Sequence, residues 1–165
     1  MNIRDATPDD VPAINRLYNA LIATTTVAWT EVPETLATRA AWLAEQVRAG
    51  HPVLVAEVDG AVVGFASYDD FRDSAKWPGY RFTVEHTIHV DGEHHGAGIG
   101  RDLLEALIGQ ALLAGKHSVI GAIDSENTGS IRFHQKLGFV EVARMPEVGY
   151  KFDRWLNLVL MQRTL

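Results

Sequence analysis

Hydrophobic and polar residues repeat along the chain with two different periods, and these periods divide it into helices and strands. After Thr7, apolar positions recur with the three- and four-residue spacing of one helix face. The stripe comprises Val11, Ile14, Leu17, Tyr18, Leu21 and Ile22. Thr7 and Pro8 suit the cap and the first position of a helix, so a helix is expected to begin near Pro8. The β-branched run 24–27 is expected to end it.

A second helix is predicted over residues 35–49, with Gly50 at its end. Its inward-facing positions would be Leu36, Leu43 and Val47. Two apolar runs then flank Asp59-Gly60, a pair that favours the positive φ angles of a tight hairpin turn. Residues 53–58 and 61–68 are therefore expected to form two antiparallel strands.

The second half of the chain predicts alternating strands and helices. Residues 80–90 have the composition of a long strand, which leads through a glycine-rich turn into a helix over residues 98–114. The inward positions of that helix would be Leu103, Leu104, Leu107, Ile108, Ala111 and Leu112. The other predicted elements are strands at 3–6, 119–123, 139–144 and 155–161 and a helix at 128–137. Taken in order, the elements read βααβββαβαββ, which indicates one α+β domain over residues 1–165.

Composition excludes several kinds of chemistry. The 165 residues are 47% hydrophobic and 22% charged, which is ordinary for one globular domain. The absence of cysteine excludes a disulfide scaffold, a thiolate metal site and a cysteine nucleophile. With 21 acidic against 15 basic side chains the net charge is −6, so nucleic acid is not an expected partner. No stretch reaches the roughly 18 apolar residues of a membrane span, so we expect a cytoplasmic protein without a membrane partner.

The turn Gly96-Ala97-Gly98-Ile99-Gly100 joins the strand at 80–90 to the following helix. Glycines let backbone N–H groups point into one concavity at a helix N-terminus, which together with the helix dipole suits a pyrophosphate. A tight turn with close packing would need the same glycines. The turn alone therefore does not distinguish a pyrophosphate site from a purely structural turn. A dinucleotide fingerprint would require glycine in place of Leu103, and the Lys-Ser/Thr pair of a nucleotide P-loop is absent.

This turn and the segment 127–139 (Asn-Thr-Gly-Ser-Ile-Arg-Phe-His-Gln-Lys-Leu-Gly-Phe) follow the fourth and fifth predicted strands. Their order resembles that of the GNAT superfamily of N-acetyltransferases, over essentially the whole chain. The resemblance implies a three-layer αβα fold whose mixed, mostly antiparallel central sheet carries helices on both faces. It also implies acetyl-CoA as co-substrate, its pyrophosphate on the glycine-rich turn and its pantetheine arm along residues 127–139. The cofactor-binding residues so implied are Ile88, His89, Val90, His95, Gly96, Ala97, Gly98, Ile99, Gly100, Arg101, Asn127 and Ser130.

Three further segments are similar to the phosphinothricin and methionine sulfoximine or sulfone acetyltransferase branch of that superfamily. They are 25–29, 83–86 and 145–155. The resemblance implies a homodimer that acetylates the α-amino group of a small amino-acid analogue. The chain departs from the branch at His95, where Arg or Gln is usual, and at Ala97, where a basic residue is usual. Phosphate binding should therefore depend more on backbone amides and Arg101, and a longer loop at 69–79 should alter the substrate contacts.

Glu85 is the candidate general base, since an ammonium must lose a proton before it can attack a thioester. The alternative is a structural or solvent-facing glutamate, the common state of a lone acid in a strand. Side chains alternate along a strand, so Arg81 and Glu85 would share one face and His86 the other. Arg81 and Glu85 would then stand about 13 Å apart at about 3.3 Å per residue, which suits the two ends of one small substrate.

Arg81 and Arg72 are the candidates for binding the substrate carboxylate, because a guanidinium fork matches such a group. A solvated loop arginine is the alternative for Arg72. Trp29, Tyr80 and Trp155 are candidates for an apolar pocket wall, with core packing as the alternative. The full predicted substrate-binding set is Trp29, Arg72, Gly79, Tyr80, Arg81 and Lys151.

His134 is the candidate catalytic residue for protonating the leaving thiolate, because histidine titrates near neutrality. It could equally line the cofactor arm. Backbone N–H groups near His89 and Val90 suit the oxyanion. Four histidines lie within ten residues, but His86 and His89 would face opposite sides of a strand, so no metal is expected.

The leading hypothesis is acetyl transfer from acetyl-CoA to the α-amine of such an analogue by direct attack in a ternary complex. The absence of cysteine agrees with it, because an acetyl intermediate on a protein thiol is excluded. Two alternatives stay open. One is a different amine, such as an aminoglycoside or a peptide N-terminus, and the other is a non-catalytic acyl-CoA binding module.

Overall fold

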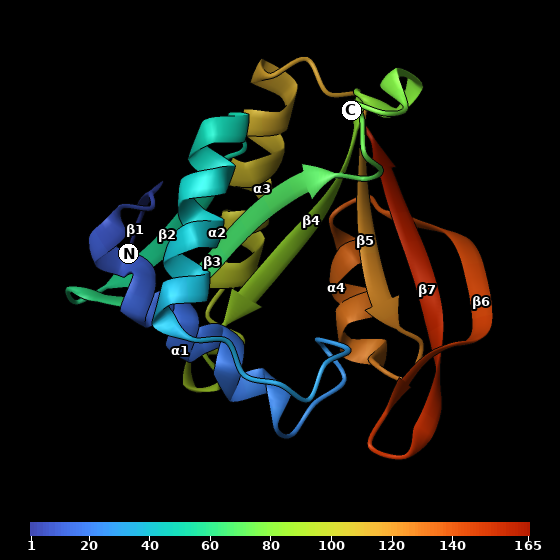
Figure 1. Cartoon of the computed structure of the whole chain (residues 1–165), viewed down its shortest axis with the longest axis horizontal. Coiled ribbons are helices and arrows are strands. Elements are labelled where there is room, and N and C mark those ends of the chain that lie inside the picture. Colours follow the sequence, from blue (N-terminus) through green and yellow to red (C-terminus); the bar gives the residue numbers. More distant parts are fainter.

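The computed structural model describes residues 1–165 as one seven-stranded sheet between two pairs of helices (Figure 1). The strands are β1 (Asn2–Asp5), β2 (Val53–Val58), β3 (Ala61–Asp70), β4 (Thr83–Val90), β5 (Ser118–Asp124), β6 (Val140–Lys151) and β7 (Arg154–Thr164). The helices are α1 (Val11–Ile22), α2 (Leu36–Ala49), α3 (Ile99–Leu113) and α4 (Thr128–Lys136). The predicted element order and the α+β class are confirmed.

The sheet has the strand order β1-β2-β3-β4-β5-β7-β6, and every neighbouring pair except β4 and β5 is antiparallel. Helices α1 and α2 cover one face, where Ile14 and Phe65 belong to a small core. Helices α3 and α4 cover the other face, over a larger core that contains Leu103 and Val119. This is the three-layer, mostly antiparallel arrangement that the resemblance implies. None of the helices is long and apolar enough to cross a membrane.

The parallel strands β4 and β5 are joined over only part of their length. Paired positions end at Glu85 and Ile120, and beyond them the two strands diverge (Figure 1). Strand β4 continues to Val90 beside β3, whereas β5 continues to Asp124 beside β7. A wedge-shaped opening, here called the wedge, therefore begins at Glu85 in the middle of the sheet.

The buried face of α2 differs from the predicted one. Leu36 and Val47 are 53% and 69% exposed. The side chains that α2 buries are Arg39, Leu43 and Gln46. The guanidinium of Arg39 lies over the rings of Tyr18 and Trp42, 4.3 and 4.6 Å from their centroids. Cation–π contacts thus let a charged side chain occupy a position that the periodicity assigns to an apolar one.

Other predicted boundaries also change. The predicted stripe of α3 is buried except at Leu112, which is exposed. Strand β4 begins at Thr83 rather than Tyr80, because Pro78–Tyr80 forms a 3-10 turn whose proline fixes φ in a helical range. Strands β6 and β7 are longer than predicted and form one hairpin, which turns at Phe152 and Asp153 with positive φ at both residues.

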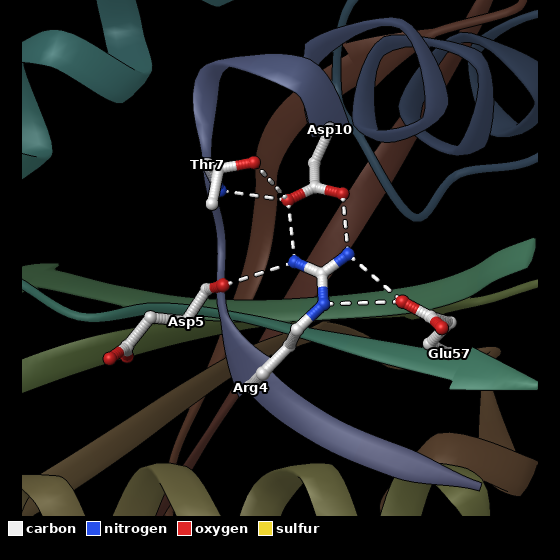
Figure 2. Close-up of polar contacts among 5 residues, drawn as sticks. All are labelled: Arg4, Asp5, Thr7, Asp10 and Glu57. Carbon is white, nitrogen blue, oxygen red and sulfur yellow. Dashed lines mark hydrogen bonds and ion pairs between the residues drawn. The ribbon is translucent and has the colours of Figure 1, made fainter. Parts of the chain in front are cut away.

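A polar network joins β1 to the start of α1 (Figure 2). Thr7 caps a 3-10 turn, Pro8–Asp10, which leads into α1 as the sequence predicts. Arg4 donates to both carboxylate oxygens of Asp10 at 2.8 and 2.9 Å and to Glu57 of β2 at 3.0 Å. Asp10 also accepts from the Thr7 amide at 2.7 Å. The Arg4 hydrogen bonds, followed by those of Thr7, lower the pKa of Asp10 from 3.8 to about 2.

Replacing Asp10 with alanine is expected to lower the free energy of unfolding at neutral pH by about 2 kcal/mol, because a helix cap and two charge-assisted hydrogen bonds are lost. The folded-state pKa of Asp10 is depressed, so its contribution is present above pH 3.8 and is lost as the pH falls toward 2. Urea unfolding of both proteins over this range measures the effect. Asp9→Ala, at an exposed position of the same turn, is the control. A deficit that stays constant down to pH 2 would contradict this explanation.

Candidate active site

A pocket of about 380 Å³ lies in the wedge between β4 and β5. Strand β4 contributes residues 85–89 and β5 contributes residues 121–124, while residues 27–29 come from the loop between α1 and α2. The remaining lining residues are Tyr18, Asn127, Ser130, His134 and Leu158. Both faces of the sheet thus open into one space, because the strands separate there.

Glu85 lies at the apex of the wedge, where the pairing of β4 with β5 ends. Its side chain is partly buried, and this burial raises the pKa of its carboxyl above 4.5, with the charge of Asp69 as the second cause. Asp69 stands opposite Glu85 in the register of β3 and β4. A carboxylate with a raised pKa accepts a proton more readily than an ordinary one, so the position and the electrostatics both suit a general base.

His86 and His134 form a buried imidazole pair at the back of the pocket. Nδ1 of His134 lies 2.7 Å from the Ser130 carbonyl, which can only accept, so this nitrogen carries a proton. Nε2 of neutral His134 is then an acceptor, and it receives the hydrogen of His86 Nε2 at 3.0 Å. Burial lowers the pKa of both rings, that of His86 to about 3.

The general-acid role predicted for His134 stays a prediction. In the neutral pair the ring proton of His134 is held by a carbonyl, and a second proton on Nε2 would require His86 to carry its hydrogen on Nδ1, which has no partner. The geometry fits the alternative that His134 lines the pocket. Gly121 leaves the space for the pair, since a Cβ there would stand 3.0 Å from His86 Nε2 and 3.2 Å from His134 Nε2.

His89 points to the opposite face of β4 from His86, as strand alternation predicts. Its ring packs against Phe65 and Tyr18, at centroid distances of 5.0 and 5.7 Å, on the side covered by α1. Burial lowers the pKa of His89 to about 4, and the charge of Arg39 acts in the same direction. No group of three or more potential metal ligands comes together anywhere in the chain.

The glycine-rich turn has the backbone conformation that an anion cradle requires. Gly96 and Gly98 have φ of 82° and 85°, and Gly98 is the N-cap of α3. The backbone amides of Ile99, Gly100 and Arg101 have no acceptor within the chain, so they are available to a phosphate.

The side chains around the glycine-rich turn differ in burial and in hydrogen bonding. That of Ile99 is buried in the core, so only its amide can contact a ligand. Nε2 of His95 donates to the carbonyl of Val90 at 3.0 Å, which ties the turn to the end of β4. Ala97 and Arg101 are exposed, and Gly100 approaches Phe133 of α4 closely.

Asn127 and Ser130 line the pocket at the start of α4. Asn127 is the N-cap of that helix, and its Oδ1 accepts from the Ser130 amide at 3.1 Å. The pocket also contains Ile88 and His89 of the predicted cofactor set. The pocket therefore extends from the apex of the wedge, past the start of α4, to His89, one residue before the end of β4.

A family model described as the acetyltransferase (GNAT) family matches residues 14–139, most of the chain. This chain belongs to the GNAT acetyltransferase family. A Pseudomonas aeruginosa L-methionine sulfoximine/L-methionine sulfone acetyltransferase is 45% identical to it over 165 residues, 99% of this chain and 94% of that protein. A phosphinothricin N-acetyltransferase of Alcaligenes faecalis is 37% identical over 164 residues, 99% of this chain and 82% of that protein.

Solved structures agree with this assignment. A Salmonella typhimurium protein, described as an acetyltransferase with its cofactor acetyl-CoA, superimposes with a TM-score of 0.95 at 43% identity, covering 100% of this chain and 94% of that one. The predicted family and fold are thus confirmed, and the chain is a GNAT acetyltransferase.

Five members of the predicted substrate-binding set lie outside the pocket of this acetyltransferase. They are Arg72, Gly79, Tyr80, Arg81 and Lys151. Arg81 follows the 3-10 turn instead of lying on β4, and it donates to the Pro78 carbonyl at 2.8 Å, so it does not share a strand face with Glu85. The Arg72 guanidinium lies 5.6 Å from the Tyr80 ring centroid. Within one chain these arginines belong to a surface loop.

Of the three aromatic residues predicted for the pocket wall, Trp29 lines it. Trp155 is 61% exposed and stacks edge-on with Tyr150 at 5.0 Å, and Tyr80 is also exposed. Lys151 is 1% exposed and gives its protons to main-chain carbonyls, so the prediction that it contacts the substrate is wrong.

Two pocket residues of the acetyltransferase escaped the sequence analysis. Asp124 is buried at the end of β5, where it accepts from the Thr26 hydroxyl and, at 3.1 Å, from the Glu126 amide. Its signal in the sequence is an acid directly after the apolar run 119–123, at the end of a strand that borders the wedge. Tyr18 belongs to the apolar stripe of α1, so nothing in the pattern separates it from the core.

Proposed function

We propose that this acetyltransferase uses acetyl-CoA to acetylate the α-amino group of a small amino-acid analogue of the phosphinothricin or methionine sulfoximine type. The observation that carries the proposal is a partly buried carboxyl of raised pKa, Glu85, at the apex of a small pocket. The names of the relatives support the substrate class. A cytoplasmic location is part of the proposal.

Acetyl-CoA fits the residues present. The free amides at the N-terminus of α3 would hold its pyrophosphate, and Asn127 and Ser130 would line its arm. Bound there, it supplies an activated acetyl thioester beside the wedge. The protein then has to position an amine, remove its proton and stabilise an oxyanion.

Glu85 takes one proton from the substrate ammonium, directly or through a water, and so frees the nitrogen lone pair. That deprotonation costs about 3 to 4 kcal/mol when the amine pKa is 2 to 3 units above ambient pH. The nitrogen then forms the bond to the acetyl carbon, and the bond from that carbon to sulfur breaks. The second proton of the nitrogen passes to the leaving thiolate, directly or through a water, which gives the amide and the free thiol. Backbone N–H groups near His89 and Val90 would stabilise the oxyanion.

Thiol release from acetyl-CoA tests the proposal with phosphinothricin, methionine sulfoximine and methionine sulfone, against an aminoglycoside and a short peptide. Turnover with the three analogues is the expected result. Turnover with the other amines alone would reject the substrate class. Coenzyme A binding by calorimetry without turnover on any amine would indicate a binding module instead.

We propose that the protein acts as a homodimer through the outer edge of the sheet. Strand β6 is the edge strand, and the hairpin of β6 and β7 exposes a series of large apolar side chains. They are Val140, Val142, Met145, Val148, Tyr150, Phe152 and Trp155. An exposed apolar edge strand favours pairing with another chain, and a second copy agrees with the homodimers of the branch that the sequence resembles.

Val142→Glu is expected to convert the protein from a dimer into a monomer, because a charge would be buried at the proposed interface. Sedimentation equilibrium measures the mass of the particle in solution. Val47→Glu, which changes an equally apolar and exposed side chain on α2, should leave the mass at that of the wild type. A dimer that survives Val142→Glu, or a wild-type monomer, would reject this interface.

A further inference from the structure

The loop between α1 and α2 forms one wall of the pocket through Val27, Ala28 and Trp29. It crosses from the α1 side of the molecule toward the ends of β5 and β7 (Figure 1). The loop has no strand or helix of its own, so contacts with the rest of the chain must fix its position. Asn19 of α1 and Arg39 of α2 hold its far end at Glu34. The contacts of its first half, which includes the pocket wall, come from the C-terminal half of the sheet.

Lys151, the last residue of β6, makes the largest of these contacts. Its ammonium donates to the carbonyls of Ile22, Thr25 and Ala28 at 2.7, 2.7 and 2.8 Å. An ammonium has three protons, so this set is complete. The three acceptors run from the C-terminus of α1 to the pocket wall. One side chain therefore fixes the whole first half of the loop.

Gly149, two residues before Lys151 on β6, contacts the loop through the Trp29 ring. A Cβ at Gly149 would stand 2.1 Å from two atoms of the Trp29 ring, so the indole lies directly on the glycine. Residues 146–148 form a bulge between paired positions of β6, and the Glu147 amide donates to Asn157 of β7 at 2.8 Å. The bulge changes the course of the strand just before Gly149 and Lys151.

The Thr26 hydroxyl adds a third contact, to the Asp124 carboxylate at the wedge. The loop is thus held at its carbonyls, at its indole and at one hydroxyl. The three partners, Lys151, Gly149 and Asp124, are distant from the loop in sequence. None of them belongs to the glycine-rich turn or to α4, and only Asp124 lines the pocket.

We infer that Lys151 is a positioning residue for the amine side of the active site: it holds the loop that places Trp29 against the substrate and does not touch the substrate itself. The inference rests on the proposed function in one respect, namely that the acceptor amine binds beside Trp29. Since the cofactor contacts lie elsewhere, loss of Lys151 should weaken amine binding and leave coenzyme A binding unchanged.

The test compares Lys151→Met, which keeps the length of the side chain and removes its three donors, with Arg48→Met, which removes an exposed cation on α2, away from the pocket, the glycine-rich turn and α4. We expect the KM for the amine to rise at least about tenfold in Lys151→Met with kcat changed less than about threefold, the sign of lost substrate binding. The Kd of coenzyme A, measured by calorimetry, should stay within about twofold of the wild type. Arg48→Met should behave as the wild type in both assays.

Hydrogen exchange supplies a readout that does not depend on turnover. Amides of residues 23–29 should exchange faster in Lys151→Met, while those of α3 keep their wild-type rates. Unchanged protection of the loop would overturn the inference whichever amine is acetylated. A parallel rise of the coenzyme A Kd and the amine KM would also overturn it, because it would indicate general damage to the fold.

Gly149→Ala covers the case in which Lys151→Met does not fold. It removes no buried charge, but its methyl group would displace the Trp29 ring. The same rise in amine KM without a change in coenzyme A binding is expected, and an unchanged amine KM would reject the role of this wall. If the substrate class proposed above is wrong, the kinetics are measured with the amine that the wild type does acetylate, so the two proposals fail separately.

Discussion

Replacing Glu85 with glutamine is expected to lower kcat/KM for the amine at neutral pH by about 100- to 10,000-fold, the usual contribution of a positioned general base. Glutamine keeps the size and hydrogen-bonding ability of the side chain but cannot accept the proton of the ammonium. Steady-state thiol release measures the loss. Glu45→Gln, at an exposed position of α2, is the matched control and should leave the rate unchanged.

The pH dependence of this variant distinguishes a base from a structural carboxyl. Glu85 acts when ionised, and burial raises its pKa, so the acid-side fall of the wild-type rate should lie above the ordinary 4.5 of a glutamate. At high pH the amine loses its proton without help, so the deficit of Glu85→Gln should shrink as the pH rises. A deficit of constant size at every pH would remove Glu85 as the base.

Stability gives a second control on the same substitution. A carboxyl with a raised folded-state pKa binds its proton more tightly when folded, so its ionised form destabilises the fold at neutral pH. Glu85→Gln should therefore unfold at the same or a higher urea concentration than the wild type. Lost activity in a protein that is no less stable identifies a functional group.

The sequence predicts those features that depend on neighbouring residues. The hairpin at Asp59-Gly60, the cap at Thr7 and the glycine-rich turn before α3 each follow from backbone preferences, and each is where the pattern puts it. The sequence also indicates Glu85 as a site residue. It is a charged residue in the middle of a strand that leads into the glycine-rich turn.

Long-range contacts could not be predicted in the same way. Lys151 is buried because carbonyls more than 120 positions earlier in the chain accept its protons, and no local pattern shows them. His86 of β4 and His134 of α4 meet because Gly121 of β5 leaves space for them. In each case a buried polar side chain forms its hydrogen bonds with residues distant in the sequence. From the sequence pattern alone, such a side chain is predicted to be exposed or catalytic.

Gly98, the N-cap of α3, and Gly109, inside α3, allow the same glycine-to-alanine substitution to be compared at a strained position and at an ordinary helical one. Gly98→Ala is expected to raise the KM for acetyl-CoA about tenfold or more, because a side chain costs about 1–2 kcal/mol in the left-handed conformation and 1.4 kcal/mol corresponds to a factor of ten. Gly98 has φ of 85° and caps the helix whose free amides would hold the phosphates under this proposal. To relieve the strain, the turn must rotate those amides away.

Gly109→Ala places the same methyl group in the middle of the same helix, where no atom lies within 4 Å of the new Cβ. It should leave the KM for acetyl-CoA unchanged and raise the free energy of unfolding by about 0.5–1 kcal/mol, since glycine is a poorer helix former than alanine. Calorimetry with coenzyme A and urea unfolding compare the two variants directly. Equal coenzyme A affinity in both would show that the phosphates are held by side chains such as that of Arg101, and the backbone cradle at the N-terminus of α3 would have to be abandoned. Weaker binding in Gly98→Ala alone, at a stability close to that of the wild type, would show that the conformation of the turn sets the affinity.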